Sequence, residues 1–314
     1  MTLKLPFHNS QLCPLQMDPN PALTHLYSCS RWSDFDPNKV IADYVRIGEE
    51  TCEQLREKVH IEDLPYFDLG DTNTLTQVDI WGEVKDHLVI FIHGGFWQEG
   101  TRKVVSPAAV NLVKRSLAMA AVGYDYASPT HPLSKVVQQV VTATELVAFF
   151  KFLFNFVSDT QFLLSKYPEV KTVTLAGHSA GAQLAFRVAA QLRHPKIQRL
   201  ILFAGVFDLK ELPLCEIGAV IGMTPGEAKK GSCSASELEG LNIRVQILIA
   251  GKDSPKLIEQ NRAMVSEMKE HGVSVDAHEF VDCDHFSIIH GLRHGNEKQT
   301  REFVAFLCDN AFSS

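Results

Sequence analysis

A serine between two glycines, at a predicted junction of strand and helix, is the residue of this sequence that most suggests chemistry. Residues 177–181 read GHSAG, with a short apolar run at 172–176 before them and a helical pattern over 180–191 after them. Glycines permit a sharp turn that lifts the Ser179 hydroxyl above the edge of a sheet. In this context the G-x-S-x-G pattern predicts a nucleophilic serine rather than a glycine-rich turn without chemistry.

Such a serine needs a base to take its proton and an acid to orient that base. The run at 245–250 predicts a strand, and Asp253 follows it closely. The strand expected over 274–281 is followed by His285. The chain order serine, acid, histidine is known on parallel-sheet scaffolds. We therefore predict Ser179 as nucleophile, Asp253 as acid and His285 as base.

Three other side chains compete for these roles. Asp208 also follows a predicted strand and could be the acid, but Asp253 holds the more usual late position. Asp284 adjoins His285, and because neighbouring side chains generally diverge, it is expected to cap the loop. His178 adjoins the serine, and the turn should point it away from a substrate.

A second glycine turn could stabilise negative charge. Residues 93–97 read HGGFW and follow an apolar run that predicts a strand. Charge that develops on a carbonyl oxygen needs fixed N–H donors, and small residues let the backbone approach it. We assign these donors to the backbone N–H groups of Ala180 and of Gly94 or Gly95. His93 is expected to orient the loop rather than to react.

The elements that would position these residues alternate along the chain. The sequence predicts six strands and six helices: strands over 87–92, 118–124, 172–176, 199–204, 245–250 and 274–281, and helices over 37–59, 105–117, 133–156, 180–191, 256–271 and 296–309. Buried strands separated by helices predict an α/β fold with a mostly parallel sheet covered on both faces, and its active site at the carboxyl ends of the strands. Weak periodicity over 209–241 favours a small cap insertion.

The positions of the motifs favour one domain over residues 24–314, because residues from 88 to 286 must converge on one sheet edge. Residues 1–23 are rich in proline and polar residues, lack the apolar core of a signal peptide, and are expected to form a flexible leader. The most apolar stretch, 140–157, is interrupted by charged residues. It indicates a buried helix rather than a membrane span.

Composition excludes several classes of protein. The 314 residues are 45% hydrophobic and 21% charged, which is typical of a globular protein. The net charge of −7 argues against a nucleic-acid partner. The 7 cysteines form no C-x-x-C pair and fit a reduced cytosolic compartment. Neither H-E-x-x-H nor a G-x-G-x-x-G after the first strand occurs, so no metal and no dinucleotide cofactor is predicted.

In this order the motifs resemble the α/β-hydrolase superfamily. HGGFW and GHSAG are joined by GKDSP at 251–255 and DHF at 284–286. Residues 124–132 resemble the segment after the fourth strand in the hormone-sensitive-lipase-like branch. That branch usually has HGGG, whereas Phe96 replaces the third glycine here. HGG-aromatic-Trp-Gln is instead similar to the kynurenine formamidases (arylformamidases), as are the stretches at 27–32 and 205–209.

The resemblance implies a serine hydrolase that cleaves N-formyl-L-kynurenine to L-kynurenine and formate, in tryptophan catabolism. It also implies a homodimer and a cytosolic location that can extend to the nucleus. Phe96 and Trp97 would either wall the substrate's aromatic ring or pack in the core. Ser28, Arg31 and Trp32 would either approach the pocket or dock the N-terminal segment. The alternatives are a broad carboxylesterase or lipase, and a ligand-binding protein without catalysis.

Overall fold

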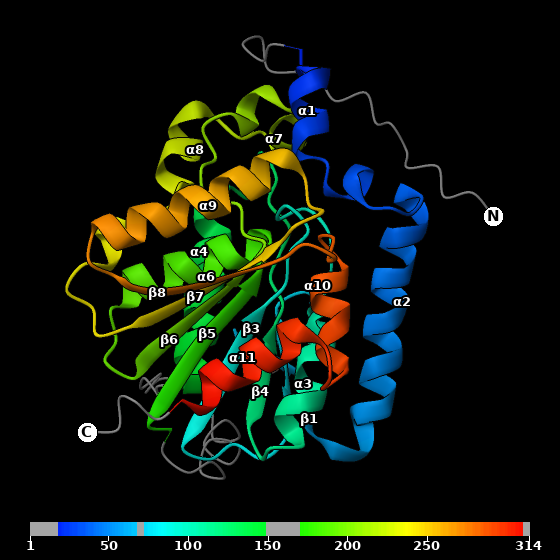
Figure 1. Ribbon diagram of the computed structural model, residues 1–314, viewed down its shortest axis with the longest axis vertical. Helices are drawn as coiled ribbons and strands as arrows, with labels where there is room; N and C mark the ends of the chain where they lie inside the picture. Colours follow the sequence, from blue (N-terminus) through cyan, green and yellow to red (C-terminus); the bar gives the residue numbers. More distant parts are fainter. Residues whose placement is uncertain (1–17, 68–71, 149–169, 310–314) are drawn as a thin grey trace.

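An eight-stranded sheet in the order β1-β2-β4-β3-β5-β6-β7-β8 forms the centre of the molecule (Figure 1). The computed structural model describes residues 18–67, 72–148 and 170–309. β2 pairs antiparallel with β1 and β4. The other neighbours in this order, β4-β3-β5-β6-β7-β8, pair in parallel. The strands are β1 (Val59–Pro65), β2 (Gln77–Trp81), β3 (His87–Ile92), β4 (Ala118–Val122), β5 (Thr172–His178), β6 (Ile197–Phe203), β7 (Arg244–Ala250) and β8 (Ser274–Phe280).

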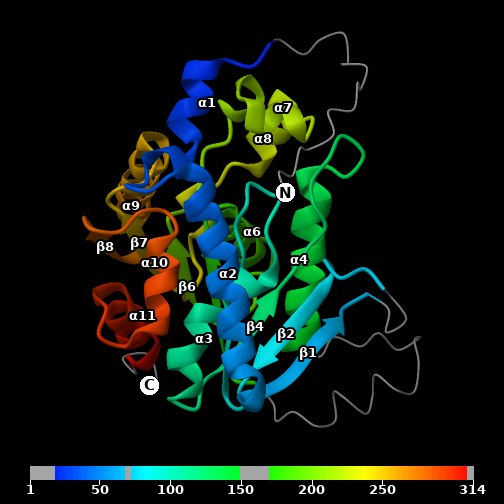
Figure 2. The same ribbon diagram turned by 90° about the vertical axis from the view of Figure 1, so that its right-hand side faces the viewer.

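Helices cover both faces of this sheet, so α2 and α4 lie on opposite sides of it (Figure 2). One face carries α2 (Pro37–Leu55), α3 (Ser106–Val113), α10 (Ser287–His290) and α11 (Lys298–Cys308). The other carries α4 (Leu133–Ala148), α6 (Ala180–Leu192) and α9 (Pro255–Glu270). The predicted α/β fold with a mostly parallel, doubly covered sheet is confirmed.

The central strand β3 shows why these strands appear in the sequence as continuous apolar runs. Leu88, Ile90 and Ile92 pack into the core on the α4 and α6 side, whereas Val89 and Phe91 pack into the core on the α3 and α11 side. All five side chains are fully buried. Because successive side chains of a strand point to opposite faces, a strand covered on both sides must be apolar at every position.

A set of short helices fills the segment between β6 and β7: η4 (Leu212–Leu214), α7 (Glu216–Val220), α8 (Pro225–Gly231) and η5 (Ala235–Leu238). These helices contact α4, α6 and α9, and α7 lies beside α1 (Pro21–Tyr27) at the upper end of the molecule in Figure 1. They occupy the stretch 209–241 that the sequence analysis interprets as a cap insertion. The short lengths of these helices explain its weak periodicity.

The first helix begins inside the stretch 1–23 that is predicted to be a flexible leader. Helix α1 begins at Pro21, and the Asn20 side chain caps it by accepting from the N–H of Leu23. Residues 1–17 of the predicted leader lie outside the described residues. The 3-10 helix η1 (Cys29–Trp32) connects α1 to α2, and the Asp36 carboxylate caps α2.

Several predicted boundaries differ from the structure. The helix expected over 37–59 ends at Leu55, and η2 (Arg56–Lys58) leads into β1. η3 (Arg102–Val105) precedes α3, which ends at Val113 rather than at 117. The end of the helix expected over 133–156 lies outside the described residues. η6 (Gly291–Arg293) separates α10 from α11.

The sequence prediction does not include the strands β1 and β2 at the antiparallel edge, in which polar residues alternate with apolar ones. On β2, Asp79 is 1% exposed, and its carboxylate lies 2.8 Å from the Arg102 guanidinium. A buried carboxylate is tolerated in a sheet when a distant cation compensates it. That compensation is visible only in three dimensions.

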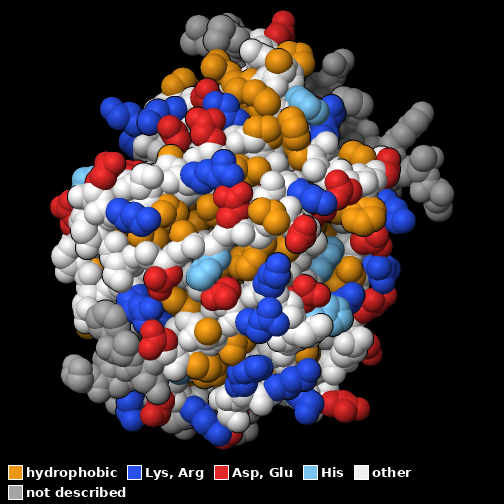
Figure 3. Space-filling model, in the orientation of Figure 1, with side chains coloured by type: hydrophobic (Ala, Val, Ile, Leu, Met, Phe, Trp, Pro, Cys, Tyr) orange, Lys and Arg blue, Asp and Glu red, His pale blue; other side chains and the backbone are white. Residues whose placement is uncertain are grey.

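The visible surface carries mixed charge. Acidic and basic side chains are interspersed over the face in Figure 3, which fits the modest net charge of −7. In the described part of the chain, no helix is long and apolar enough to span a membrane.

Candidate active site

Ser179 lies on the turn between β5 and α6, in a backbone conformation that side chains rarely adopt. Its φ and ψ are 58° and −123°. Such strain persists at functional sites when the surroundings hold it in place. Here the Ser179 N–H donates to the carbonyl of Phe203 on β6 at 2.9 Å. The turn therefore has the geometry expected for a nucleophile that projects from the end of β5.

The two glycines of G-x-S-x-G are needed for close packing of backbone around this turn. A Cβ on Gly177 would lie 2.1 Å from the carbonyl oxygen of Gly181. A Cβ on Gly181 would lie 2.2 Å from the carbonyl oxygen of Ile92, at the end of β3. Both distances are far below van der Waals contact, so the pattern sets how closely β3, β5 and α6 approach at the serine.

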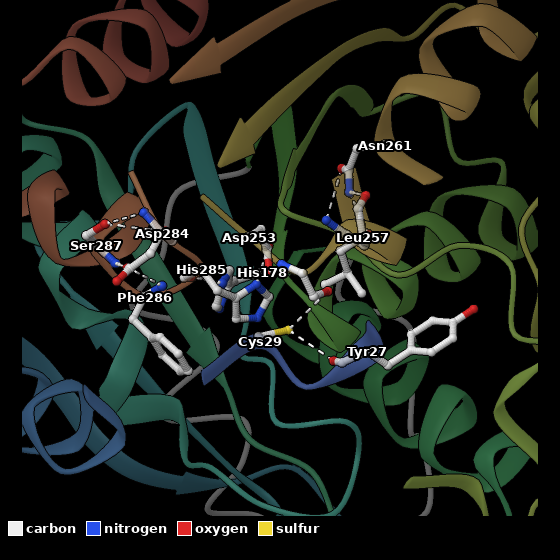
Figure 4. Close-up of polar contacts among 12 residues, drawn as sticks. Tyr27, Cys29, His178, Asp253, Leu257, Asn261, Asp284, His285, Phe286 and Ser287 are labelled. Carbon is white, nitrogen blue, oxygen red and sulfur yellow. Dashed lines mark hydrogen bonds and ion pairs between the residues drawn. The ribbon is translucent and has the colours of Figure 1, made fainter. Parts of the chain in front are cut away.

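The structure brings together the predicted base and acid, which come from the loops after β8 and β7 (Figure 4). His285 Nδ1 and Asp253 Oδ2 are 2.6 Å apart, and both residues are 4% exposed. Because a carboxylate only accepts, Nδ1 carries the proton and Nε2 is left as the basic nitrogen. Asp253 Oδ1 accepts from the N–H of Ser254 at 2.6 Å. Among the described residues, the Ser179 hydroxyl forms no hydrogen bond to His285, and such bonds are often long before substrate binds.

The competing carboxylates occupy other positions. Asp208 is exposed and pairs with Lys210 at 3.1 Å, so Asp253 rather than Asp208 reaches His285. Asp284 accepts from the backbone N–H groups of Phe286 and Ser287 at 3.0 and 2.7 Å, as predicted for a loop cap. Burial tends to raise the pKa of Asp284, but hydrogen bonds to its carboxylate outweigh this and hold the pKa below its usual value.

The predicted oxyanion loop lies directly against the serine. A Cβ on Gly94 would be 2.7 Å from the Ser179 Cβ, so only glycine fits there. Gly95 has a φ of 103° and turns the chain sharply. Ala180 is the first residue of α6, where a backbone N–H has no acceptor within the helix. The proposed donors therefore flank Ser179 from two elements.

Hydrogen bonds from the side chains of His93 and Tyr124 hold this loop in place. His93 Nδ1 donates to the carbonyl of Gly94 at 2.7 Å. The Tyr124 hydroxyl lies 2.9 Å from the carbonyl oxygen of His93 and 3.1 Å from that of Gly94. Burial lowers the pKa of His93 to about 4, so its ring is neutral at pH 7. These contacts fit the orienting role predicted for His93.

The two aromatic residues of HGGFW differ in their surroundings. Phe96 and Trp97 both have positive φ angles, 46° and 62°, which continue the turn begun by Gly95. Trp97 is fully buried, and its Nε1–H donates to the Gln183 side chain on α6 at 3.0 Å. For Trp97 the packing alternative therefore fits the structure, and a substrate wall does not. Phe96 is only partly buried and retains exposed surface beside the loop.

Cys29 lies beside the acid and the base, a position that sequence reasoning did not predict (Figure 4). Its Sγ and one atom each from Asp253 and His285 all lie within 4.8 Å of one another. Burial, reinforced by the Asp253 charge, raises the pKa of the Cys29 thiol well above its usual value. A metal would need the Cys29 thiolate, which this shift disfavours, and a carboxylate whose two oxygens already accept from His285 and Ser254. The donor set therefore fits the hydrogen-bonded pair of His285 and Asp253 better than a metal site.

The Ser28 and Trp32 side chains form hydrogen bonds within the N-terminal segment. The Ser28 hydroxyl donates to the carbonyl of Thr24 at 2.8 Å, and Trp32 Nε1–H donates to the carbonyl of His25 at 3.0 Å. Trp32 also borders a surface groove that reaches Asp253. The bond of Ser28 fits the docking alternative, whereas Trp32 lies where it can also approach the pocket.

Comparison with known proteins supports the fold described above. Residues 89–218, which hold the oxyanion loop and the serine turn, match the α/β hydrolase fold family. The chain has the α/β hydrolase fold. It is 26% identical to the kynurenine formamidase of Danio rerio over 85% of its own length and 89% of that protein. For the kynurenine formamidase of Salmo salar the identity is 26%, over 89% and 93%. The predicted resemblance to kynurenine formamidases is thus confirmed.

Solved structures support the same fold. Esterase B from Lactobacillus rhamnosis matches the hydrolase with a TM-score of 0.63 and 16% identity, over 86% of this chain and 92% of that one. A hyperthermophilic esterase from Pyrobaculum calidifontis matches with a TM-score of 0.61 and 17% identity, over 93% and 97%. At such identities the likeness concerns the fold alone.

Proposed function

We propose that this hydrolase cleaves N-formyl-L-kynurenine to L-kynurenine and formate, with Ser179, Asp253 and His285 as its catalytic residues. The observation that carries the catalytic part is the buried 2.6 Å hydrogen bond between His285 and Asp253, next to the strained Ser179 turn. Similarity to kynurenine formamidases over most of the chain supports the choice of substrate.

The reaction begins when His285 Nε2 takes the proton of the Ser179 hydroxyl as Oγ attacks the formyl carbon. The carbonyl oxygen becomes an oxyanion, which accepts hydrogen bonds from the backbone N–H of Ala180 and of Gly94 or Gly95. His285 then gives its proton to the departing aryl nitrogen, and the C–N bond breaks. Water attacks the formyl-serine with His285 again as base, and formate leaves. Asp253 keeps the imidazole in the required tautomer and stabilises its positive charge.

The shape of the site suits this substrate. The Gly94 backbone lies so close to Ser179 that little room remains on that side, and a formyl group needs little. The leaving amine is conjugated to a ketone through the aromatic ring, so it departs more readily than an alkyl amine. Phe96 is the residue of the loop that we expect to contact that ring.

The test compares kcat/KM for N-formyl-L-kynurenine with that for p-nitrophenyl acetate and butyrate, using wild type and Ser179→Ala. We expect the formamide to be the better substrate and Ser179→Ala to lose both activities. A strong preference for the esters would replace this proposal with a broad carboxylesterase. An active-site serine probe that fails to label Ser179 would point to a ligand-binding protein without catalysis.

Two further proposals rest on the resemblance to kynurenine formamidases rather than on a contact in the structure. The first is that the enzyme forms a homodimer, and sedimentation equilibrium of the purified protein tests it. The second is that the enzyme resides in the cytosol and the nucleus, and imaging of the tagged full chain tests it.

A further inference from the structure

His178, the second residue of the GHSAG motif, precedes Ser179 and lies beside His285, the predicted base (Figure 4). It is 1% exposed, and its Nε2 is 2.8 Å from the backbone carbonyl oxygen of His285. Its Nδ1 is 3.1 Å from the hydroxyl of Tyr44 on α2. The established steps of a serine hydrolase leave this buried imidazole without a role.

The partners of His178 determine where its proton lies. A carbonyl oxygen only accepts hydrogen bonds, so Nε2 must carry the proton and donate to His285. Nδ1 then has a lone pair and accepts from the Tyr44 hydroxyl. Burial raises the pKa of Tyr44, which keeps this hydroxyl a donor. The two bonds together select one of the two neutral tautomers.

We propose that His178, whose ring is anchored by Tyr44, is a positioning residue that sets the distance between the nucleophile and the base. The proposal rests on the function proposed above. His178 is bonded covalently to Ser179 and by a hydrogen bond to the main chain of His285. His285 is therefore held at two points. Asp253 holds its imidazole ring, and His178 holds its backbone carbonyl.

The position of His178 also requires it to stay neutral. Its ring centroid is 4.5 Å from that of His285, which becomes positively charged during the reaction. A second positive charge so close would oppose that step. Burial, helped by the neighbouring His285, lowers the pKa of His178 well below its usual value. The other titratable groups that face it are Tyr44 from α2, His290 from α10 and His93 from the oxyanion loop.

If Tyr44 could no longer donate, His178 would lose the hydrogen bond at Nδ1 that fixes the plane of its ring. The ring could then turn, and the Nε2–H bond to the His285 carbonyl would weaken or break. The base loop would then be free to shift while the rest of the fold stays packed. This separates a positioning role from a merely structural one.

The experiment uses the full-length enzyme and four variants. His178→Leu removes the donor, whereas His178→Gln offers an amide N–H that can reach the same carbonyl. Tyr44→Phe removes only the hydroxyl. The matched control, Ser106→Ala, removes a buried hydroxyl that donates to the carbonyl of Gly48 on α2 at 2.8 Å, on the same helix as Tyr44. Each variant is assayed for kcat and KM, for the rate of Ser179 labelling by a fluorophosphonate, and for Tm.

We expect His178→Leu to lower kcat and the labelling rate by about 10- to 100-fold with KM within about twofold, since one or two buried hydrogen bonds are lost. His178→Gln should recover most of this loss. Tyr44→Phe should lower kcat by about three- to tenfold. Ser106→Ala should leave kcat unchanged, although it should lower Tm about as much as Tyr44→Phe does.

Several results would overturn the proposal. They are a folded His178→Leu enzyme with near-wild-type kcat, a Gln variant no better than Leu, or a Tyr44→Phe enzyme that matches Ser106→Ala. If His178→Leu does not fold, Tyr44→Phe and its control still decide the question. Labelling separates the two hypotheses: wild type that is labelled but ignores N-formyl-L-kynurenine refutes the substrate alone. Wild type that is not labelled refutes both.

Discussion

Replacement of Asp253 by asparagine tests the acid assignment most directly, because both oxygens of this carboxylate accept hydrogen bonds. Oδ2 accepts from His285 Nδ1–H at 2.6 Å and Oδ1 from the N–H of Ser254 at 2.6 Å. An asparagine has a single acceptor oxygen, so in either amide orientation one donor would face another donor.

The imidazole of His285 can relieve this conflict by changing its tautomer, but the change abolishes its function as a base. If the amide N–H₂ faces Nδ1, the ring proton moves to Nε2, and the nitrogen aimed at the serine can no longer accept a proton. The corresponding loss in triads of this kind is about ten-thousandfold in kcat, or about 5.5 kcal/mol in activation free energy. The fold should tolerate the change, since the side chains have nearly the same shape.

The assay is kcat for N-formyl-L-kynurenine, with fluorophosphonate labelling as a second measure of serine reactivity and Tm as a check on folding. Asp208→Asn is the matched control, because Asp208 is exposed and its carboxylate bonds to Lys210 and Ser232, in the segment between β6 and β7. We expect it to retain activity within about twofold. Near-wild-type turnover in Asp253→Asn, with a collapse in Asp208→Asn, would refute the reasoning and reverse the assignment.

Three further substitutions test the elements around the site. Gly181→Ala should prevent stable folding or lower Tm sharply, because the new Cβ would lie 2.2 Å from the carbonyl oxygen of Ile92; an unchanged Tm would contradict the close packing at the turn. Arg102→Met should lower the free energy of unfolding by about 3–5 kcal/mol in urea titrations, because it leaves Asp79 buried without its cation; a loss below about 1 kcal/mol would contradict the compensation argument. Tyr124→Phe should lower kcat about tenfold with little change in KM, because it releases the carbonyls of the oxyanion loop; equal kcat would show that other contacts hold this loop.

The sequence predicted the central part of the sheet and the proposed catalytic residues because both depend on local patterns. A strand buried on two faces has to be apolar throughout, as β3 is from Leu88 to Ile92. A serine elbow has to carry glycines where chains nearly touch, as at Gly177 and Gly181. An acid and a base can be found because each follows a strand whose carboxyl end lies at the same sheet edge.

Features that depend on distant partners could not be predicted in this way. Strand β2 holds Asp79 in its buried interior only because Arg102 reaches it from η3. Cys29 lies beside Asp253 because α1 and η1 dock across the end of the sheet, and a lone cysteine in a polar segment gives no indication of this. The short helices of the 209–241 segment have too few turns to produce a clear period.

His178 shows the difference within a single motif. Its neighbours in GHSAG are constrained by backbone geometry, and any residue that fits the turn would satisfy the pattern at position 178. The side chain acquires its role from Tyr44, 134 residues earlier, and from the carbonyl of His285, 107 residues later. Because the His285 carbonyl can only accept, the proton of His178 lies on Nε2. The side chain at this variable position of the motif thus links the nucleophile turn to helix α2 and to the base loop. A substitution of His178 should therefore change the rate of reaction more than the stability of the turn.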